Sequence, residues 1–415
     1  MKLTKEQLRE INEIGKFLIK SSDYFSDFEE DLIYSEERIQ EIIDEEEDIQ
    51  YLHIDFPGEH ESASIETEEF LKLGNEIKSL KIVNKNYIKT NLRRYYIVAA
   101  TDSEETHVLS EYSNIQTSTL NGTKINILTE SVIVGLAATI LGEYDKDYWG
   151  TYSQYFSIEI IYNSAENVLN DEKEIDLLNS FLFEVADTTG IALNFSEINS
   201  PIDDYFEFSE TETINHPLRE LEPFNEGMKL FVSAVQIKDQ ELKFLNFYKV
   251  LEHFAPIAVN IEANELMRKK LDAPKSSFED GDFIRSIFQL ANSMRDRYND
   301  EDLIKAAFNT CFDFVGLFEE LPNSIQKKII GHLKIKKMEY GGDKQQLNTA
   351  SNIAAKIIYK TRNKVVHAKS NFIPEGEEIQ NNEFEKLNQF MKLASSQAIR
   401  WYSRQPNHLK MEIIK

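Results

Sequence analysis

Three side chains near the C-terminus have the types and the spacing that cleavage of RNA needs. Arg362, Asn363 and His367 lie in a run from Asn348 to Lys369 that contains no glycine or proline. In an α-helix Asn363 and His367 stand one turn apart, and the long side chain of Arg362 reaches the same region. A permanent cation, an amide and a titratable imidazole are therefore expected to meet on one polar face.

This set of groups fits metal-independent cleavage of an RNA phosphodiester, which needs proton transfer at the 2′-hydroxyl and the 5′-oxygen and a cation at the phosphate. Histidine titrates near neutral pH and can move the protons, while arginine binds phosphate oxygens with its planar fork. An asparagine one turn from His367 can hold the orientation of the imidazole. Three neighbouring lysines are expected to contact the RNA backbone: Lys360, Lys364 and Lys369.

The same residues have a simpler interpretation. Basic side chains late in a helix are ordinary, because they interact favourably with the helix dipole, and an arginine five residues before a histidine is a weak motif by its spacing. The additional asparagine and the long uninterrupted helix make a chance occurrence of the motif less frequent. From the residues alone, both a catalytic role and ordinary charge placement remain as interpretations of these side chains.

Apolar periodicity predicts the elements that position the motif. One buried stripe of a helix runs through Ala354, Ile358, Thr361, Val365 and Ala368. Short breaks rich in Gly, Pro, Asn or Asp separate most of the other expected helices, as in a bundle. The expected helices of this C-terminal half span 226–237, 241–258, 260–270, 280–298, 301–319, 322–337, 346–371 and 382–404.

The run Arg362-Asn363-Lys-Val-Val-His367 resembles the R-N-x-x-x-H signature of the HEPN superfamily, whose all-α domains include many metal-independent ribonucleases. Phe244–Phe254 resembles an early helix of the HEPN domains that end bacterial antiphage proteins, and Pro223–Phe231 resembles the lead-in to that helix. The similarity covers about residues 220–410 and says little about the rest.

The resemblance implies a helical bundle that forms a homodimer, so that two motifs line one cleft. It implies RNA as the substrate and a role as toxin or antiphage defence effector. By position, Arg362, Asn363 and His367 are implied to be catalytic. Glu252 is implied to be the acidic residue near the motif, although an exposed helix carboxylate explains it equally well.

The charge distribution supports a nucleic-acid partner for the C-terminal half alone. The net charge of −26 argues against such a partner for the whole chain. Residues 228–415, however, hold 29 basic and 24 acidic side chains, which leaves 17 basic and 48 acidic ones for residues 1–227. Residues 321–415 are the most basic, with 17 basic and 8 acidic side chains.

The N-terminal half reads as a mixed α/β domain. Residues 4–48 have helical periodicity, and helices are also expected at 70–80 and 172–188. Proline and carboxylate residues in the segment 199–226 indicate the boundary. The expected fold is therefore α+β, with an acidic mixed α/β domain over residues 1–220 and an all-α HEPN-like domain over residues 221–415. Short β-branched or aromatic runs predict strands at 49–56, 95–100, 125–128, 155–162, 191–195 and 205–208.

Absent motifs limit the other function classes. The sequence has no phosphate-binding G-x-x-x-x-G-K-[ST], no G-x-G-x-x-G after a strand, no G-x-S-x-G and no C-x-x-C pair. We therefore expect no cofactor and no metal. The single cysteine, Cys311, and the lack of a signal peptide or long apolar run predict a cytoplasmic protein without membrane contact.

Two functions are weighed. The first is an endoribonuclease whose N-terminal domain senses a trigger, such as a phage component, or inhibits the nuclease. The second is a catalytically inactive HEPN protein that binds RNA or nucleotides, or acts as an antitoxin or scaffold. The intact Arg362, Asn363 and His367 favour the first.

Overall fold

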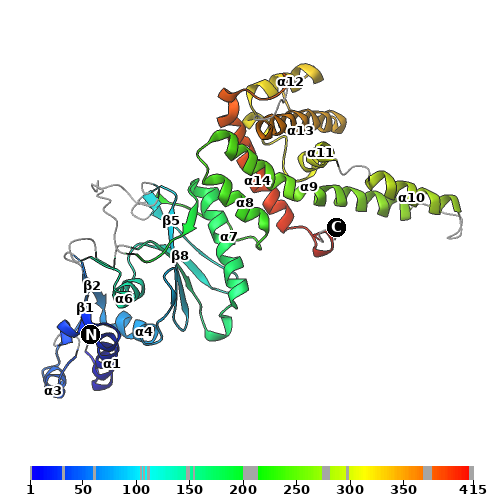
Figure 1. The fold of residues 1–415 in the computed structure, drawn as a ribbon. Coiled ribbons are helices and arrows are strands. Elements are labelled where there is room, and N and C mark those ends of the chain that lie inside the picture. The colour runs from blue at the N-terminus through cyan, green and yellow to red at the C-terminus, as the bar shows by residue number, and fades with distance from the viewer. Residues whose placement is uncertain are drawn as a thin grey trace. The chain divides into compact units, whose positions relative to one another are not determined.

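The protein has an α+β fold with strands in its N-terminal half and helices in its C-terminal half, as the sequence predicts (Figure 1). The computed structural model describes residues 2–29, 33–58, 62–102, 105, 108–109, 113–145, 150–152, 155–199, 214–272, 281–295, 299–367 and 376–410. The chain divides into two compact units. Unit 1 comprises residues 1–174 and 191–221, and unit 2 comprises residues 175–190 and 222–415.

Unit 1 is built on an antiparallel sheet. Six strands follow in the order β3-β4-β5-β9-β8-β7, and β10 pairs with β5 outside that path. Alternation along β5 places Tyr95 and Ile97 on one face and Tyr96 and Val98 on the other, and all four are buried. The strands span Lys81–Asn84 (β3), Tyr87–Lys89 (β4), Arg93–Ala100 (β5), Gln116–Ser118 (β7), Lys124–Leu128 (β8), Ser157–Ile161 (β9) and Leu193–Phe195 (β10).

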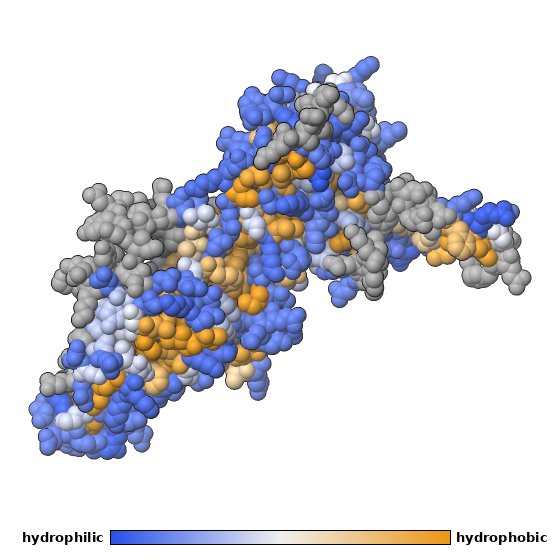
Figure 2. Space-filling view, in the orientation of Figure 1, coloured by the Kyte–Doolittle hydropathy of each residue, from blue (hydrophilic) through white to orange (hydrophobic). Residues whose placement is uncertain are grey.

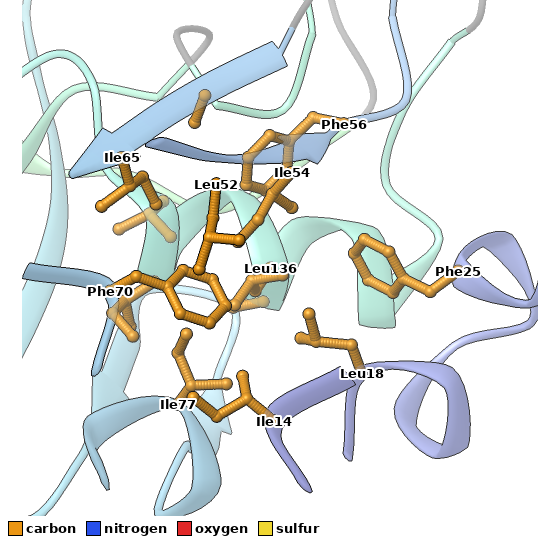
Figure 3. Packing of buried hydrophobic residues seen from close by; sticks show 14 of the residues in the cluster. Ile14, Leu18, Phe25, Leu52, Ile54, Phe56, Ile65, Phe70, Ile77 and Leu136 are labelled. Carbon is orange, nitrogen blue, oxygen red and sulfur yellow. The ribbon is translucent and has the colours of Figure 1, made fainter. Parts of the chain in front are cut away.

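The hydrophobic core of unit 1 lies between the sheet and the N-terminal elements. Figure 3 shows Leu18, Phe25, Leu52, Phe70 and Leu136 converging from five separate segments. Burial of these side chains is what holds the short elements in place, because each apolar side chain contributes about 1.5–3 kcal/mol. These elements are α1 (Lys5–Ser21), the 3₁₀ helix η1 (Asp23–Phe28), α3 (Glu36–Asp44), the hairpin β1 (Tyr51–Asp55) and β2 (Ser62–Glu66), α4 (Thr67–Lys78) and α6 (Val132–Leu141).

A buried carboxylate closes the other face of the sheet. Glu174, near the start of helix α7 (Asp171–Thr189), is 1 % exposed. It accepts hydrogen bonds from the hydroxyls of Tyr87 at 2.9 Å, Tyr96 at 2.5 Å and Tyr162 at 2.8 Å, and Arg94 Nε lies 3.3 Å away. The charge of Glu174 is therefore fully compensated in the interior.

Unit 2 is helical. Helix α9 packs against α8, α11, α13 and α14, so it forms the centre of the bundle. The helices are α8 (Glu226–Val235), α9 (Gln240–Leu271), α10 (Gly281–Arg295), α11 (Asp300–Thr310), α12 (Asn323–Leu333), α13 (Lys344–Val366) and α14 (Phe384–Ser403), together with residues 175–190 of α7.

The structure differs from the sequence-based expectations at several element ends. Residues 4–48 form α1, η1 and α3 rather than continuous helix, and α9 continues through Pro256 where a break was expected near residue 259. Helix α11 ends at Thr310 and not at residue 319, because hydrogen bonds of Asp313 hold the following residues in a turn. The N–H of Asp313 donates to the side-chain oxygen of Gln397 at 2.8 Å, and the carboxylate of Asp313 accepts from the N–H of Gly316. The expected strand 205–208 lies outside the described residues.

Most apolar side chains of the bundle are buried, but α10 is an exception. Ile284 and Phe288, one turn apart on this helix, are 43 % and 64 % exposed. In Figure 2 the same region appears as a hydrophobic surface. Among the helices whose residues are described, none combines the length and the apolar character that a membrane span needs.

A buried ion pair ties α14 to α7 within unit 2. The guanidinium of Arg400 donates to both oxygens of Glu184 and, at 2.8 Å, to Asp187. Side-chain exposure is 8 % for Arg400 and 0 % for Glu184. Loss of the arginine would leave a carboxylate buried without its cation.

We expect Arg400→Ala to lower the free energy of unfolding by about 3–5 kcal/mol, because a buried charge that loses its partner is strongly destabilising. Urea denaturation measures this change. Arg268→Ala is the control, since that side chain is 74 % exposed and its partner, Glu265, is 58 % exposed. The control substitution should lower the free energy of unfolding by less than about 1 kcal/mol. Equal effects of the two substitutions would contradict the importance of the buried pair.

Candidate active site at the end of helix α13

Helix α13 carries the motif and follows the predicted buried stripe for most of its length. The side chain of Asp343 caps its first turn by accepting from the N–H of Gln345 at 3.1 Å. Ala354, Ile358 and Thr361 are completely buried, as the periodicity predicts. This stripe fixes the rotation of the helix about its axis.

The helix ends earlier than expected. His367 is the C-cap residue, with φ −100° and ψ 11°, and its N–H donates to the carbonyl of Asn363 at 3.0 Å. His367 is an exposed residue. The predicted positions Ala368 and Lys369 lie outside the described residues.

The guanidinium of Arg362 is the centre of a small polar cluster. Its Nη1 donates to Asn363 Oδ1 at 3.1 Å, and its Nη2 lies 3.9 Å from Glu252 Oε1. The structure therefore brings together three of the four predicted catalytic residues, from helices α9 and α13. Glu252 is 41 % exposed and Arg362 25 %. At this distance and exposure the ion pair contributes little stability, which leaves the guanidinium available to a stronger anionic ligand.

Tyr248 belongs to the same cluster and was not identified from the sequence. The centre of the Arg362 guanidinium lies 5.8 Å from the centroid of the Tyr248 ring, within the range of a cation–π contact. Tyr248 is 2 % exposed, and its hydroxyl is buried without a hydrogen bond to any described residue. Burial raises the pKa of this hydroxyl, and the nearby carboxylate of Glu252 raises it further. One signal was available, because Tyr248 and Glu252 are four residues apart on one helix face.

Two of the three lysines expected to bind RNA, Lys360 and Lys364, contact a segment that packs against α13. We call residues 376–380 the α13 strap. Lys360 Nζ lies 2.5 Å from Glu377 Oε2, and Lys364 Nζ donates to the carbonyl of Ile379 at 3.2 Å. The N–H of Ile379 in turn donates to the buried hydroxyl of Thr361 at 3.1 Å. The strap is thus hydrogen-bonded to the same helix that carries the motif.

Glu377 bridges two helices through two lysines. Its Oε1 lies 2.7 Å from Lys328 Nζ on α12, while its Oε2 contacts Lys360 on α13. Hydrogen bonds from Lys328 and Lys360 lower the pKa of the Glu377 carboxyl to about 2. The carboxylate is ionised at every pH near neutrality, so the two ammonium groups always face a negative charge.

Comparison of the chain with protein-family models, curated proteins and solved structures gives no match. The resemblance to HEPN domains therefore rests on the residues quoted above. Within the part of the chain that the structure describes, no three His, Cys, Asp or Glu side chains gather in a group able to hold a metal ion.

Tyr248→Phe should leave the free energy of unfolding unchanged or raise it by up to about 1–3 kcal/mol, because it removes a buried hydroxyl that lacks a partner. Tyr248→Ala should lower it by about 3–5 kcal/mol, because it removes the ring and leaves a cavity under Arg362. Urea denaturation of both variants separates the contribution of the ring to the free energy of unfolding from that of the hydroxyl. A Phe variant that is clearly less stable than the wild type would show that the hydroxyl makes a stabilising bond.

The Glu377 contacts should give a stability that depends on pH. The folded-state pKa of about 2 lies below the ordinary 4.5, so the contribution is complete above pH 4.5 and disappears as the pH falls toward 2. We expect wild type to have a higher unfolding midpoint than Glu377→Gln at neutral pH, and this difference to shrink over that acidic range. A difference that stays constant through the titration would exclude the carboxylate as its source.

Proposed function

We propose that this protein is an endoribonuclease of HEPN type that acts as an antiphage or toxin effector. The observation that supports this proposal most directly is the cluster at the end of α13. Arg362, Asn363 and Glu252 lie together, and His367 is exposed one turn beyond Asn363. These are the groups that RNA cleavage through the 2′-hydroxyl requires, on two packed helices.

In the proposed mechanism His367 transfers the protons. As a base it removes the proton of the 2′-hydroxyl, or as an acid it protonates the leaving 5′-oxygen. The 2′-oxygen forms the new bond to phosphorus while the bond to the 5′-oxygen breaks. The products carry a 2′,3′-cyclic phosphate and a 5′-hydroxyl, with no net uptake of water in this step.

Arg362 binds the phosphate and stabilises the charge that develops on it. Its planar guanidinium suits this role because phosphate oxygens offer two hydrogen-bond acceptors where Glu252 now offers one distant contact. Asn363 orients His367, one turn away, and its Oδ1 together with the ring of Tyr248 keeps the guanidinium in place. Holding the cation before the substrate arrives reduces the entropy cost of binding.

We further propose that two copies of the helical unit pair, so that two His367 side chains share one cleft. One copy would then supply the base and the other the acid, which a single imidazole can provide only in successive steps. Unit 1 would respond to a trigger, such as a phage component, and hold the nuclease inactive until then. These assignments come from the resemblance to HEPN domains.

The experiment is incubation of the purified full-length protein with total cellular RNA in the presence of a chelator. We expect cleavage that leaves 2′,3′-cyclic phosphate ends, because none of the proposed groups requires a metal. His367→Ala should reduce the rate by about a hundredfold to ten-thousandfold, the contribution typical of a general acid or base. His53→Ala is the control, since this exposed histidine on β1 has the same chemistry but lies in unit 1.

Intact RNA with the wild-type protein under every trigger tried would overturn the nuclease assignment. If the protein then still bound RNA, the binding or scaffold function would replace it. Equal toxicity of wild type and His367→Ala on overexpression in cells would also count against catalysis by this residue.

A further inference from the structure

Helix α12 and the turn after it form a basic surface that the motif does not include. Residues 327–337 contain five lysines and a histidine and no acidic residue, in a chain whose net charge is −26. All six basic side chains belong to exposed residues. They are Lys327, Lys328, His332, Lys334, Lys336 and Lys337, and we call them the α12 basic surface.

The apolar residues of the same stretch face the interior. Ile325 and Ile329 are completely buried and Met338 is 7 % exposed. No large apolar side chain of residues 323–337 is among the exposed ones, and Figure 2 shows hydrophilic side chains over α12. A helix that lies on a membrane surface buries Trp, Phe or Leu between its cations. The α12 basic surface instead presents charge alone, which suits a polyanion in solution.

The surface continues onto α13 through a carboxylate held between two lysines. Each oxygen of Glu377 contacts one ammonium group, at 2.7 Å for Lys328 and 2.5 Å for Lys360. A phosphodiester also carries one negative charge on two terminal oxygens, so it can occupy the same position between the same cations. Lys360 is seven residues, or two helical turns, before His367 and on the same face of α13, with Lys364 between them. The row of cations therefore leads from α12 along this face of α13 toward His367.

We propose that the α12 basic surface binds the sugar–phosphate backbone of single-stranded RNA, and that Lys328 and Lys360 form a phosphate site which Glu377 occupies until RNA displaces it. The proposal deepens the function proposed above and rests on it, because it gives the path of the substrate toward the motif. The contacts are to phosphate, so this surface contributes affinity without base preference.

The first test measures binding of a fluorescent single-stranded RNA to full-length His367→Ala protein, by anisotropy at several salt concentrations. In this background Lys327→Ala with Lys336→Ala should weaken binding by about three- to tenfold. The same pair should reduce the slope of log affinity against log salt by about 0.7 for each phosphate that the protein no longer neutralises. The control pair is Lys229→Ala with Lys269→Ala, which changes the net charge equally on helices α8 and α9.

Equal weakening of RNA binding by the two pairs would show a general effect of net charge and overturn the proposal. Binding of the α12 pair to anionic phosphatidylglycerol vesicles is measured in parallel. Reduced vesicle binding with unchanged RNA binding would assign the surface to a membrane and also overturn the proposal.

The second test concerns the phosphate site. In the same background Glu377→Gln should bind RNA about three- to tenfold more tightly, because the site no longer holds its internal anion. Glu385→Gln, an equal charge change at an exposed position on α14, is the control. Adding Lys328→Ala to Glu377→Gln should remove the increase in affinity. An increase that survives this addition, or equals that of Glu385→Gln, would refute the phosphate site, and unfolding midpoints verify that each variant is folded.

These binding measurements are independent of cleavage, so the two proposals can fail separately. RNA binding that depends on the α12 basic surface, with no cleavage by the wild type, would remove the nuclease function and leave the binding surface. Cleavage by the wild type, together with RNA binding that the α12 pair leaves unchanged, would remove the binding surface and leave the nuclease function.

Discussion

The Arg362 guanidinium contacts three chemically different groups, and its position depends on the packing of the helices that carry them. The ring of Tyr248 lies within cation–π distance of the guanidinium, and the amide oxygen of Asn363 accepts a hydrogen bond from it. The carboxylate of Glu252 lies 3.9 Å from the guanidinium. Two of these groups come from α9, which is also the helix against which most of the bundle packs. The position of the cation is therefore determined by the core and not by a surface loop.

Both cationic centres of this region are matched by carboxylates in the present structure. Glu252 faces Arg362, and Glu377 contacts Lys328 and Lys360. Such pairs are partly exposed, so each is worth little in free energy and is weakened by salt. A polyanion can replace several of these carboxylates at once, with one phosphate taking the place of each carboxylate. Under the proposed function, these carboxylates occupy the cationic sites in the absence of RNA and are exchanged for phosphates when RNA binds.

The sequence predicts the parts of this arrangement that depend on local periodicity. The buried stripe of α13 and the strands around Tyr95 and Ile158 follow from the repeat of apolar residues. Tyr248 was missed because its contact with Arg362 is made between helices more than a hundred residues apart in the chain. Glu377 was missed because the strap has no periodic pattern. The end of α13 was placed too late since no glycine or proline marks it.

Pro256 has a consequence for how α9 moves. Proline lacks an N–H, so the backbone carbonyl of Glu252, four residues earlier, cannot receive the usual helical hydrogen bond from it. The helix is consequently easiest to bend one turn beyond the residue that faces Arg362. Tyr248 and Leu251, before this point, are buried in the bundle, whereas Leu266 and Leu271, beyond it, are exposed. The missing hydrogen bond thus lies between the tightly packed part of α9 that carries the motif contacts and the less buried part that follows.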